Sequence, residues 1–264
     1  MSNKDIILIA KNIDDVIDAY TSYANNANKC IIAYGDDPYT RKMKIEKEII
    51  YYGLESNNDI RATNIKYHEN GVSFDIEGYG HFDLPLYGKH QLLDCLAVIT
   101  VCSLEGISAS VVQNNLSKFK GAKRRFTETK VGNNVIIDDY AHHPTEIAAT
   151  LEATKNTPHD ELWVIFQPHT YTRTYALLDQ FAKVLSTADH VVLADIYAAR
   201  EKDTGMVSSK DLCEKINSMG GNAIHIGDFL SIEKFVEKSC KKNDLLITMG
   251  AGNVDIIGDS LLKK

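Results

Sequence analysis

The second half of the chain repeats one hydrophobic pattern: a short apolar stretch rich in β-branched residues, a loop, and an amphipathic segment. The apolar stretches are VIID (135–138), LWVIF (162–166), HVVLA (190–194), AIHI (223–226) and LLITM, which ends directly before Gly250. The amphipathic segments between them begin near Pro144, Thr174, Ser208 and Ser231, and a last one follows Asn253. Strands that alternate with helices in this way predict parallel βαβ units in a doubly wound α/β sheet.

The first half has a different texture, because its apolar stretches are short and lie closer together. Asn12, followed by two acidic residues, predicts the cap of a helix over 13–25. Strands are expected over 30–34, 49–52, 60–68, 72–77 and 81–85, with Asn70-Gly71 as a hairpin turn. Helices over 90–105 and 108–118 follow, the second with Ser108 as its cap. We therefore expect a smaller α/β region, preceded by one short apolar run within residues 1–11.

A basic run, KFKGAKRR (118–125), separates the two halves. It puts five cations into eight residues around a glycine, which predicts a hinge or linker and places the domains at 1–122 and 123–264. A solvated linker is the default interpretation of such a cluster. A phosphate-facing role is the sharper hypothesis, and it applies to Arg125 alone.

Composition excludes several classes of protein. With 44% hydrophobic residues, 25% charged residues and a net charge of −7, the chain has the balance of a globular protein and no basic footprint for duplex DNA. Its apolar stretches are far shorter than the ~20 residues that cross a bilayer, and no signal-peptide pattern occurs. The five cysteines are scattered and never spaced as C-x-x-C. We expect a reduced, cytoplasmic protein without nucleic-acid or membrane partners.

Polar residues that a core cannot hold cheaply gather in loops after three predicted strands: 139–146, 167–174 and 250–253. Ligands of open α/β sheets bind beyond the carboxyl ends of the strands, so these loops are the candidate site. The candidates are Asp139, His142, His169 and Arg173, with Gly250 and Gly252 as places where backbone can approach a ligand. An arginine fork suits a carboxylate or a phosphate.

Each candidate also has a plainer interpretation. His143, directly before Pro144, is expected to be the residue that enters a helix. His142 and His169 could be loop histidines bonded to backbone, and Arg173 could brace a surface loop. The His142-His143 pair has no third ligand at a helpful spacing, so zinc is disfavoured. No G-x-S-x-G and no loop cysteine occurs, so we expect a site that positions anionic partners without a covalent enzyme intermediate.

Several longer strings resemble the Mur ligases of peptidoglycan synthesis, which are ATP-dependent amide ligases. They are DDYAHHPTEI (138–147), FQPHTYTRT (166–174), MGAGNV (249–254), YGKHQLLDCLAV (87–98) and GAKRRF (121–126). The resemblance makes residues 1–122 the remnant of a central ATPase domain and 123–264 a Rossmann-like C-terminal domain. A G-x-x-x-x-G-K-[ST] phosphate loop is missing. The chain is therefore expected to be a fragment or truncated product that is inactive alone, with a front-half polypeptide as a possible partner.

The resemblance implies a two-step reaction: ATP phosphorylates the carboxylate of UDP-N-acetylmuramate, and the amine of L-alanine then attacks the acyl phosphate. Magnesium is implied too, but its ligands belong to the missing front part, and no metal residue is assigned here. The resemblance also implies roles for individual residues: Asp139 for the ATP ribose, Arg125 for its phosphates, His90, Gln91 and Asp94 for adenine, and His142 and Arg173, with His169 beside them, for the L-alanine carboxylate.

Departures from the family pattern leave alternatives open. Gln91 and Asp94 replace asparagines, and an ionised Asp94 can accept from the adenine amino group but cannot donate to a ring nitrogen. Thr170 replaces an arginine that many relatives have. A recycling ligase that adds a tripeptide to the same sugar nucleotide is one alternative, although Tyr140 and Glu146 favour L-alanine. A non-catalytic nucleotide- or amino-acid-binding domain is the other.

Overall fold

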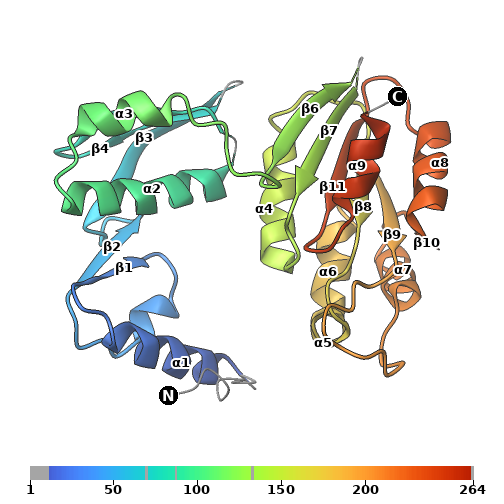
Figure 1. Cartoon of the computed structure of the whole chain (residues 1–264), viewed down its shortest axis with the longest axis horizontal. Coiled ribbons are helices and arrows are strands. Elements are labelled where there is room, and N and C mark those ends of the chain that lie inside the picture. The colour runs from blue at the N-terminus through green and yellow to red at the C-terminus, as the bar shows by residue number, and fades with distance from the viewer. Residues whose placement is uncertain (1–11, 69–70, 87, 132–133, 263–264) are drawn as a thin grey trace. The chain divides into compact units, whose positions relative to one another are not determined.

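The structure is a computed structural model that describes residues 12–68, 71–86, 88–131 and 134–262. Asn70, Tyr87 and the short apolar run within residues 1–11 lie outside the described residues. The chain divides into two compact units, Met1–Lys120 and Gly121–Lys264 (Figure 1). Each unit has its own sheet and core, so each is described by itself.

Unit 1 contains a five-stranded sheet with the strand order β1-β2-β3-β4-β5. Strands β1 to β3 run parallel, and β3 to β5 run antiparallel. The elements are α1 (Ile13–Asn25), β1 (Ile31–Tyr34), η1 (Thr40–Lys42), β2 (Ile49–Gly53), β3 (Ile60–His68), β4 (Gly71–Ile76), β5 (Gly80–Leu84), α2 (Lys89–Leu104) and α3 (Ala109–Leu116).

Local sequence accounts for most of these boundaries. The Asn12 side chain accepts a hydrogen bond from the Asp15 N–H at 2.9 Å, which confirms the predicted cap of α1. Ser108 is the N-cap residue of α3, as predicted, although its hydroxyl lies 3.2 Å from the Ser110 hydroxyl and bonds no helix N–H. The core of the unit forms where β4 and β5 pack on α2, with the Phe74 and Phe82 rings stacked at 5.7 Å.

Unit 2 contains a six-stranded sheet with the strand order β10-β9-β8-β11-β7-β6. The five predicted strands are present and parallel. The elements are β6 (Thr127–Val131), β7 (Asn134–Asp139), α4 (Pro144–Thr154), β8 (Leu162–Phe166), α5 (Tyr171–Ala176), α6 (Leu178–Leu185), β9 (His190–Ala194), α7 (Ser209–Ser218), β10 (Ala223–Gly227), α8 (Phe229–Ser239), β11 (Leu245–Met249) and α9 (Asp255–Leu261).

Three features of unit 2 differ from the sequence prediction. Strand β6 was not predicted; it pairs antiparallel with β7 at the sheet edge, where its polar sequence TETKV is tolerated. The helix after β8 starts at Tyr171, not near Thr174, and it is divided into α5 and α6 at Leu177. Helix α8 starts two residues early because Asp228 caps it, accepting from the Ser231 N–H.

Helices cover both faces of the unit 2 sheet, with α4 and α6 on one side and α8 and α9 on the other (Figure 1). Alternate residues of β8 explain how. Phe166 packs on Phe181 of α6 at 5.7 Å, whereas Trp163 and Ile165 share a core with Ile232 of α8. The unit is therefore a doubly wound, Rossmann-like sheet. Its parallel strands all end at one edge, where their loops meet.

Candidate functional site

The loops that follow four parallel strands of unit 2 are in direct contact. The rings of His142, after β7, and His169, after β8, meet edge to face at 5.7 Å. The His169 ring also stacks on Tyr197, in the loop after β9, with centroids 5.7 Å apart. Backbone bonds fix this stack, because the Tyr197 N–H donates to the Pro168 carbonyl at 2.8 Å. His169 and Tyr197, which are 28 positions apart in the chain, are therefore held side by side.

His169 and Arg173 form a pair whose protonation can be assigned from geometry. Arg173 Nη1 lies 3.1 Å from His169 Nδ1, and a guanidinium can only donate. Nδ1 is therefore the acceptor, and the imidazole proton sits on Nε2. Burial lowers the pKa of His169, and the charges of Arg173 and His142 lower it further. His169 thus presents a neutral ring with an Nε2–H donor.

His142 carries its proton on the other nitrogen. Its Nδ1 lies 3.0 Å from the Tyr140 carbonyl and 3.4 Å from a Glu146 carboxylate oxygen, and both are acceptors. A proton on Nδ1 leaves Nε2 as an acceptor whenever the ring is neutral. His143 is the N-cap of α4: its Nδ1 accepts from the Thr145 N–H at 3.3 Å, and Pro144 occupies the first helical position. The plainer interpretation of His143 is therefore confirmed.

Asp139 ends β7 as a buried carboxylate, with only 4% of the residue exposed. One of its oxygens accepts from the Phe126 N–H at 2.8 Å and the other from the Ala141 N–H at 2.7 Å. Burial raises the pKa of Asp139, while these backbone hydrogen bonds lower it. Arg124 and Phe126 have the left-handed φ angles of 59° and 51°, which are costly for side-chain-bearing residues. The Asp139 carboxylate therefore holds the turn into unit 2 in place.

The two neighbouring arginines of the basic run both lie over the Tyr140 ring but differ in exposure and hydrogen bonds. The Arg124 side chain is 16% exposed and bonds the carbonyl oxygens of both Gly250 and Gly252, as well as Asp138. Arg125 lies with its guanidinium 5.6 Å from the centre of the Tyr140 ring. No hydrogen bond of the Arg125 side chain to another part of the described chain occurs, and the residue is exposed. Sequence reasoning selected Arg125 and missed Arg124.

Gln167 connects the loop after β8 to the loop after β11. Its side-chain oxygen accepts from the Asn253 N–H at 3.0 Å, and its amide lies 3.3 Å from the Asn253 side-chain oxygen. Gly250 has a φ of 149°, and a Cβ there would meet the Gln167 carbonyl at 2.7 Å. A Cβ on Gly252 would strike the Gln167 side chain and the Tyr197 ring. The two glycines are thus required by close packing between loops.

Three residues that position these loops were not predicted: Gln167, Tyr197 and Glu201. The Glu201 carboxylate accepts from the N–H and the hydroxyl of Thr172, which fixes the first turn of α5. These hydrogen bonds lower the pKa of Glu201. A signal existed, since Tyr197 and Glu201 follow β9 at the same edge as the other loops. The rule that selected three loops applies to this fourth loop as well.

The predicted adenine-side residues of unit 1 all lie in the first two turns of α2. Gln91 is buried, His90 is half-buried and Asp94 is exposed. Leu92 and Leu96 of the same helix are fully buried, as expected for a helix that packs on the sheet. Asp94 acts electrostatically on its neighbours: after burial, its charge is the second cause that raises the pKa of Tyr52.

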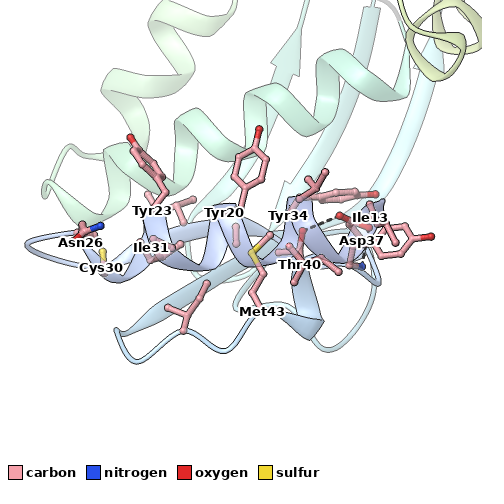
Figure 2. A pocket seen from close by; sticks show the side chains of 18 residues that line it. Ile13, Tyr20, Tyr23, Asn26, Cys30, Ile31, Tyr34, Asp37, Thr40 and Met43 are labelled. Carbon is pink, nitrogen blue, oxygen red and sulfur yellow. Dashed lines mark hydrogen bonds between the residues drawn. The ribbon is translucent and has the colours of Figure 1, made fainter. Parts of the chain in front are cut away.

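Unit 1 also contains a groove of about 680 Å³ between α1, β1 and the segment 37–45. Figure 2 shows Tyr20 and Tyr23 of α1 along one wall and Met43 on another, with Asp37 and Thr40 joined by a hydrogen bond of 2.9 Å. The lining is mainly apolar. None of the predicted site residues lines this groove, so the sequence motifs and this groove mark different places.

Comparison with known proteins places the two units in one family. Residues 9–102 match the Mur ligase middle domain, and residues 124–252 match the Mur ligase glutamate ligase domain. The chain belongs to the Mur ligase family. It is 41% identical to the UDP-N-acetylmuramate–L-alanine ligase of Caldanaerobacter subterraneus subsp. tengcongensis, an alignment that covers 96% of this chain and 57% of the relative. The chain thus spans little more than half the length of this relative.

Two solved Mur ligase structures have the same fold. The UDP-N-acetylmuramate–alanine ligase MurC of Thermotoga maritima matches with a TM-score of 0.75 and 24% identity, over 96% of this chain and 55% of that one. A murein peptide ligase of Psychrobacter arcticus matches with a TM-score of 0.69 and 21% identity, over 95% of this chain and 54% of that one. The likeness confirms the α/β fold with a Rossmann-like second unit.

The residues present fit a nucleotide in part. Arg125 offers an exposed guanidinium that suits a phosphate, whereas both Asp139 oxygens already accept backbone N–H groups. Within the described ranges, no group of three or more His, Cys, Asp and Glu side chains is placed to hold a metal ion. None of the helices described there has the length and apolar character needed to cross a membrane.

Proposed function

We propose that this chain forms the rear part of an ATP-dependent ligase that joins L-alanine to UDP-N-acetylmuramate in cell-wall synthesis in the cytoplasm. One observation carries the proposal: a chain 41% identical to a UDP-N-acetylmuramate–L-alanine ligase brings His142, His169 and Arg173 together at the carboxyl edge of its sheet. ATP, when bound, would supply the phosphoryl group that makes the muramyl carboxylate electrophilic. The side chains of this chain would bind and orient the partners.

The protonation states suggest how L-alanine is held. Its carboxylate suits the Arg173 guanidinium and the Nε2–H of His169, which are both donors. Its amine suits Nε2 of His142, the nitrogen left as an acceptor by the bond from Nδ1 to the Tyr140 carbonyl. We assign His142 to orienting the amine and accepting its hydrogen bond. Arg125 would take the nucleotide phosphates, and the Asp139 role in ribose binding stays a prediction.

The activity is tested by joining this chain to the part of the Caldanaerobacter relative that it does not cover. We expect phosphate release that requires ATP, magnesium, UDP-N-acetylmuramate and L-alanine together, and an Arg173→Ala variant that raises the KM for L-alanine. Lys183→Gln, a change of charge on α6, is the control. The 264-residue chain alone is expected to show no ligation. Phosphate release by the chain alone that depends on both substrates would refute that expectation.

Assays of the same assembled enzyme distinguish the L-alanine ligase from the two alternatives, a recycling ligase and a non-catalytic binding domain. Higher turnover with the cell-wall tripeptide than with L-alanine would favour a recycling ligase. Binding of ATP or L-alanine without phosphate release, in an assembly whose front part is correctly folded, would favour a non-catalytic binding domain. We expect L-alanine to be preferred.

A further inference from the structure

Arg124 makes contacts that none of the sequence motifs indicates. Its Nη1 donates to the Gly252 carbonyl at 2.9 Å, and its Nη2 donates to the Gly250 carbonyl at 2.8 Å. Its Nε donates to the Asp138 carboxylate at 3.2 Å. One planar guanidinium thus fixes two carbonyl groups of the loop 250–253 at the same time, which a single-point cation could not do.

The orientation of these carbonyls also decides where the loop N–H groups point. In a trans peptide the carbonyl and the N–H point in opposite directions. The Gly252 carbonyl faces Arg124, and the N–H of the same peptide, on Asn253, donates to Gln167 at 3.0 Å. The Gly250 carbonyl also faces Arg124, so the Ala251 N–H points away from it. No acceptor for the Ala251 N–H occurs among the residues that the structure describes.

We propose that Arg124 is a positioning residue that sets the shape of the loop 250–253 and aims the Ala251 N–H at an anionic oxygen of a ligand. The ligand class is a carboxylate or a phosphate, the two anions expected of the substrates. This second half of the proposal rests on the proposed function, because it needs a ligand at the loop cluster. The first half concerns the loop alone.

The loop is tested without ligand, by amide exchange and chemical shifts of Gly250, Ala251 and Asn253 in the isotope-labelled chain. In R124Q we expect the Asn253 amide to exchange about tenfold faster, because the Gly252 carbonyl of the same peptide loses its donor. R124K is expected to behave like R124Q, since lysine keeps the charge but lacks the fork. Lys123→Gln, which removes a neighbouring exposed cation, should leave the loop unchanged. Loop amides that stay as in wild type in both Arg124 variants would overturn the positioning role.

R124Q leaves the Asp138 carboxylate without its cation. If that variant fails to fold, the double variant Arg124→Gln/Asp138→Asn removes the unpaired charge, and the loop measurements are repeated on it. The same result is expected there, and wild-type exchange in the double variant would count against Arg124.

The ligand half is tested by titrating the labelled chain separately with L-alanine and with inorganic phosphate. We expect the Ala251 amide to shift with one probe in wild type and in K123Q, with affinity reduced about tenfold in R124Q. Binding that leaves the Ala251 amide unmoved would overturn the aiming role. If neither probe binds wild type, the role of the Ala251 N–H in ligand binding is overturned. The proposed function is decided separately, by phosphate release in the assembled enzyme. The positioning role of Arg124 stands if R124Q still changes the loop amides.

Discussion

The two units place their candidate residues in different ways. In unit 2, the candidates contact one another within and between loops: Arg173 bonds His169 in the segment after β8, and His169 contacts His142 in the loop after β7. Arg124 bonds the glycine loop after β11. In unit 1, His90, Gln91 and Asp94 share a helix, and the groove of that unit lies at residues the motifs do not include. The difference teaches that polar residues in loops serve two purposes. Some can face a ligand, while others brace the loops that carry them.

The largest effect is expected for Asp139→Ala, which removes a carboxylate that holds two backbone N–H groups in place. The change leaves the buried N–H groups of Phe126 and Ala141 without an acceptor, and we expect a loss of about 3 kcal/mol in the free energy of unfolding of unit 2. Urea unfolding followed by the fluorescence of Trp163, the single tryptophan, reports on this unit. Glu152→Ala, which breaks an exposed ion pair with Lys155, is the control. A loss no larger than in that control would show that the Asp139 carboxylate does not stabilise the turn into unit 2.

Gly252→Ala tests the packing between loops. The added Cβ would strike Gln167 and Tyr197, so we expect a cost of about 1–3 kcal/mol in the same unfolding experiment. Gly258→Ala is the matched control, since a Cβ there meets Thr248 at an ordinary 3.4 Å. Equal stability of the two variants would show that the loops are less tightly joined than the geometry indicates.

Arg173→Gln tests the electrostatic coupling within the cluster. Because the Arg173 charge helps to lower the pKa of His169, its removal should move that pKa up toward 6.5. A lowered folded-state pKa means that the folded protein favours the neutral form of His169. The stability present above pH 6.5 is therefore lost as the pH falls through the folded-state pKa. Arg173→Gln should reduce this loss. An NMR titration of the histidine ring resonances measures the pKa of His169, with Lys183→Gln as control. An unchanged His169 pKa in Arg173→Gln would contradict the coupling.

The smallest effect is expected in unit 1. Asp94 is exposed, so Asp94→Asn should change the free energy of unfolding by less than about 0.5 kcal/mol. An amide there can both accept and donate, so ADP should bind up to about fivefold more tightly, as expected for one added hydrogen bond. Calorimetric titration measures the affinity, with Asp18→Asn as control. Weaker ADP binding in Asp94→Asn would mean that the carboxylate itself contacts the nucleotide.

The elements were largely predictable from the sequence because most are apolar strands or capped helices. Strands β3, β8 and β9 have the predicted bounds. Strand β6 was missed because TETKV lies at an edge and has no apolar periodicity. The pattern of apolar residues identifies what is buried on two faces, and an edge strand with polar side chains gives no such signal.

The candidate site was predictable at the level of loops but not of individual atoms. The rule that ligands bind beyond the carboxyl ends of parallel strands selected loops that do contact one another. It could not tell Arg124 from Arg125, because adjacent residues in a turn point in directions that depend on φ, and Arg124 has a left-handed φ of 59°. Nor could it show that the Asp139 carboxylate is occupied by backbone N–H groups, since Phe126 reaches it from 13 residues away.

The most direct measurement of the central claim is a map of amide chemical shifts in the isotope-labelled chain as L-alanine and ADP are added together. If the unit 2 loops form one site, residues within 139–146, 167–174 and 250–253 should shift along one binding curve. Shifts confined to a single loop, or found instead along the α1 groove of unit 1, would contradict it.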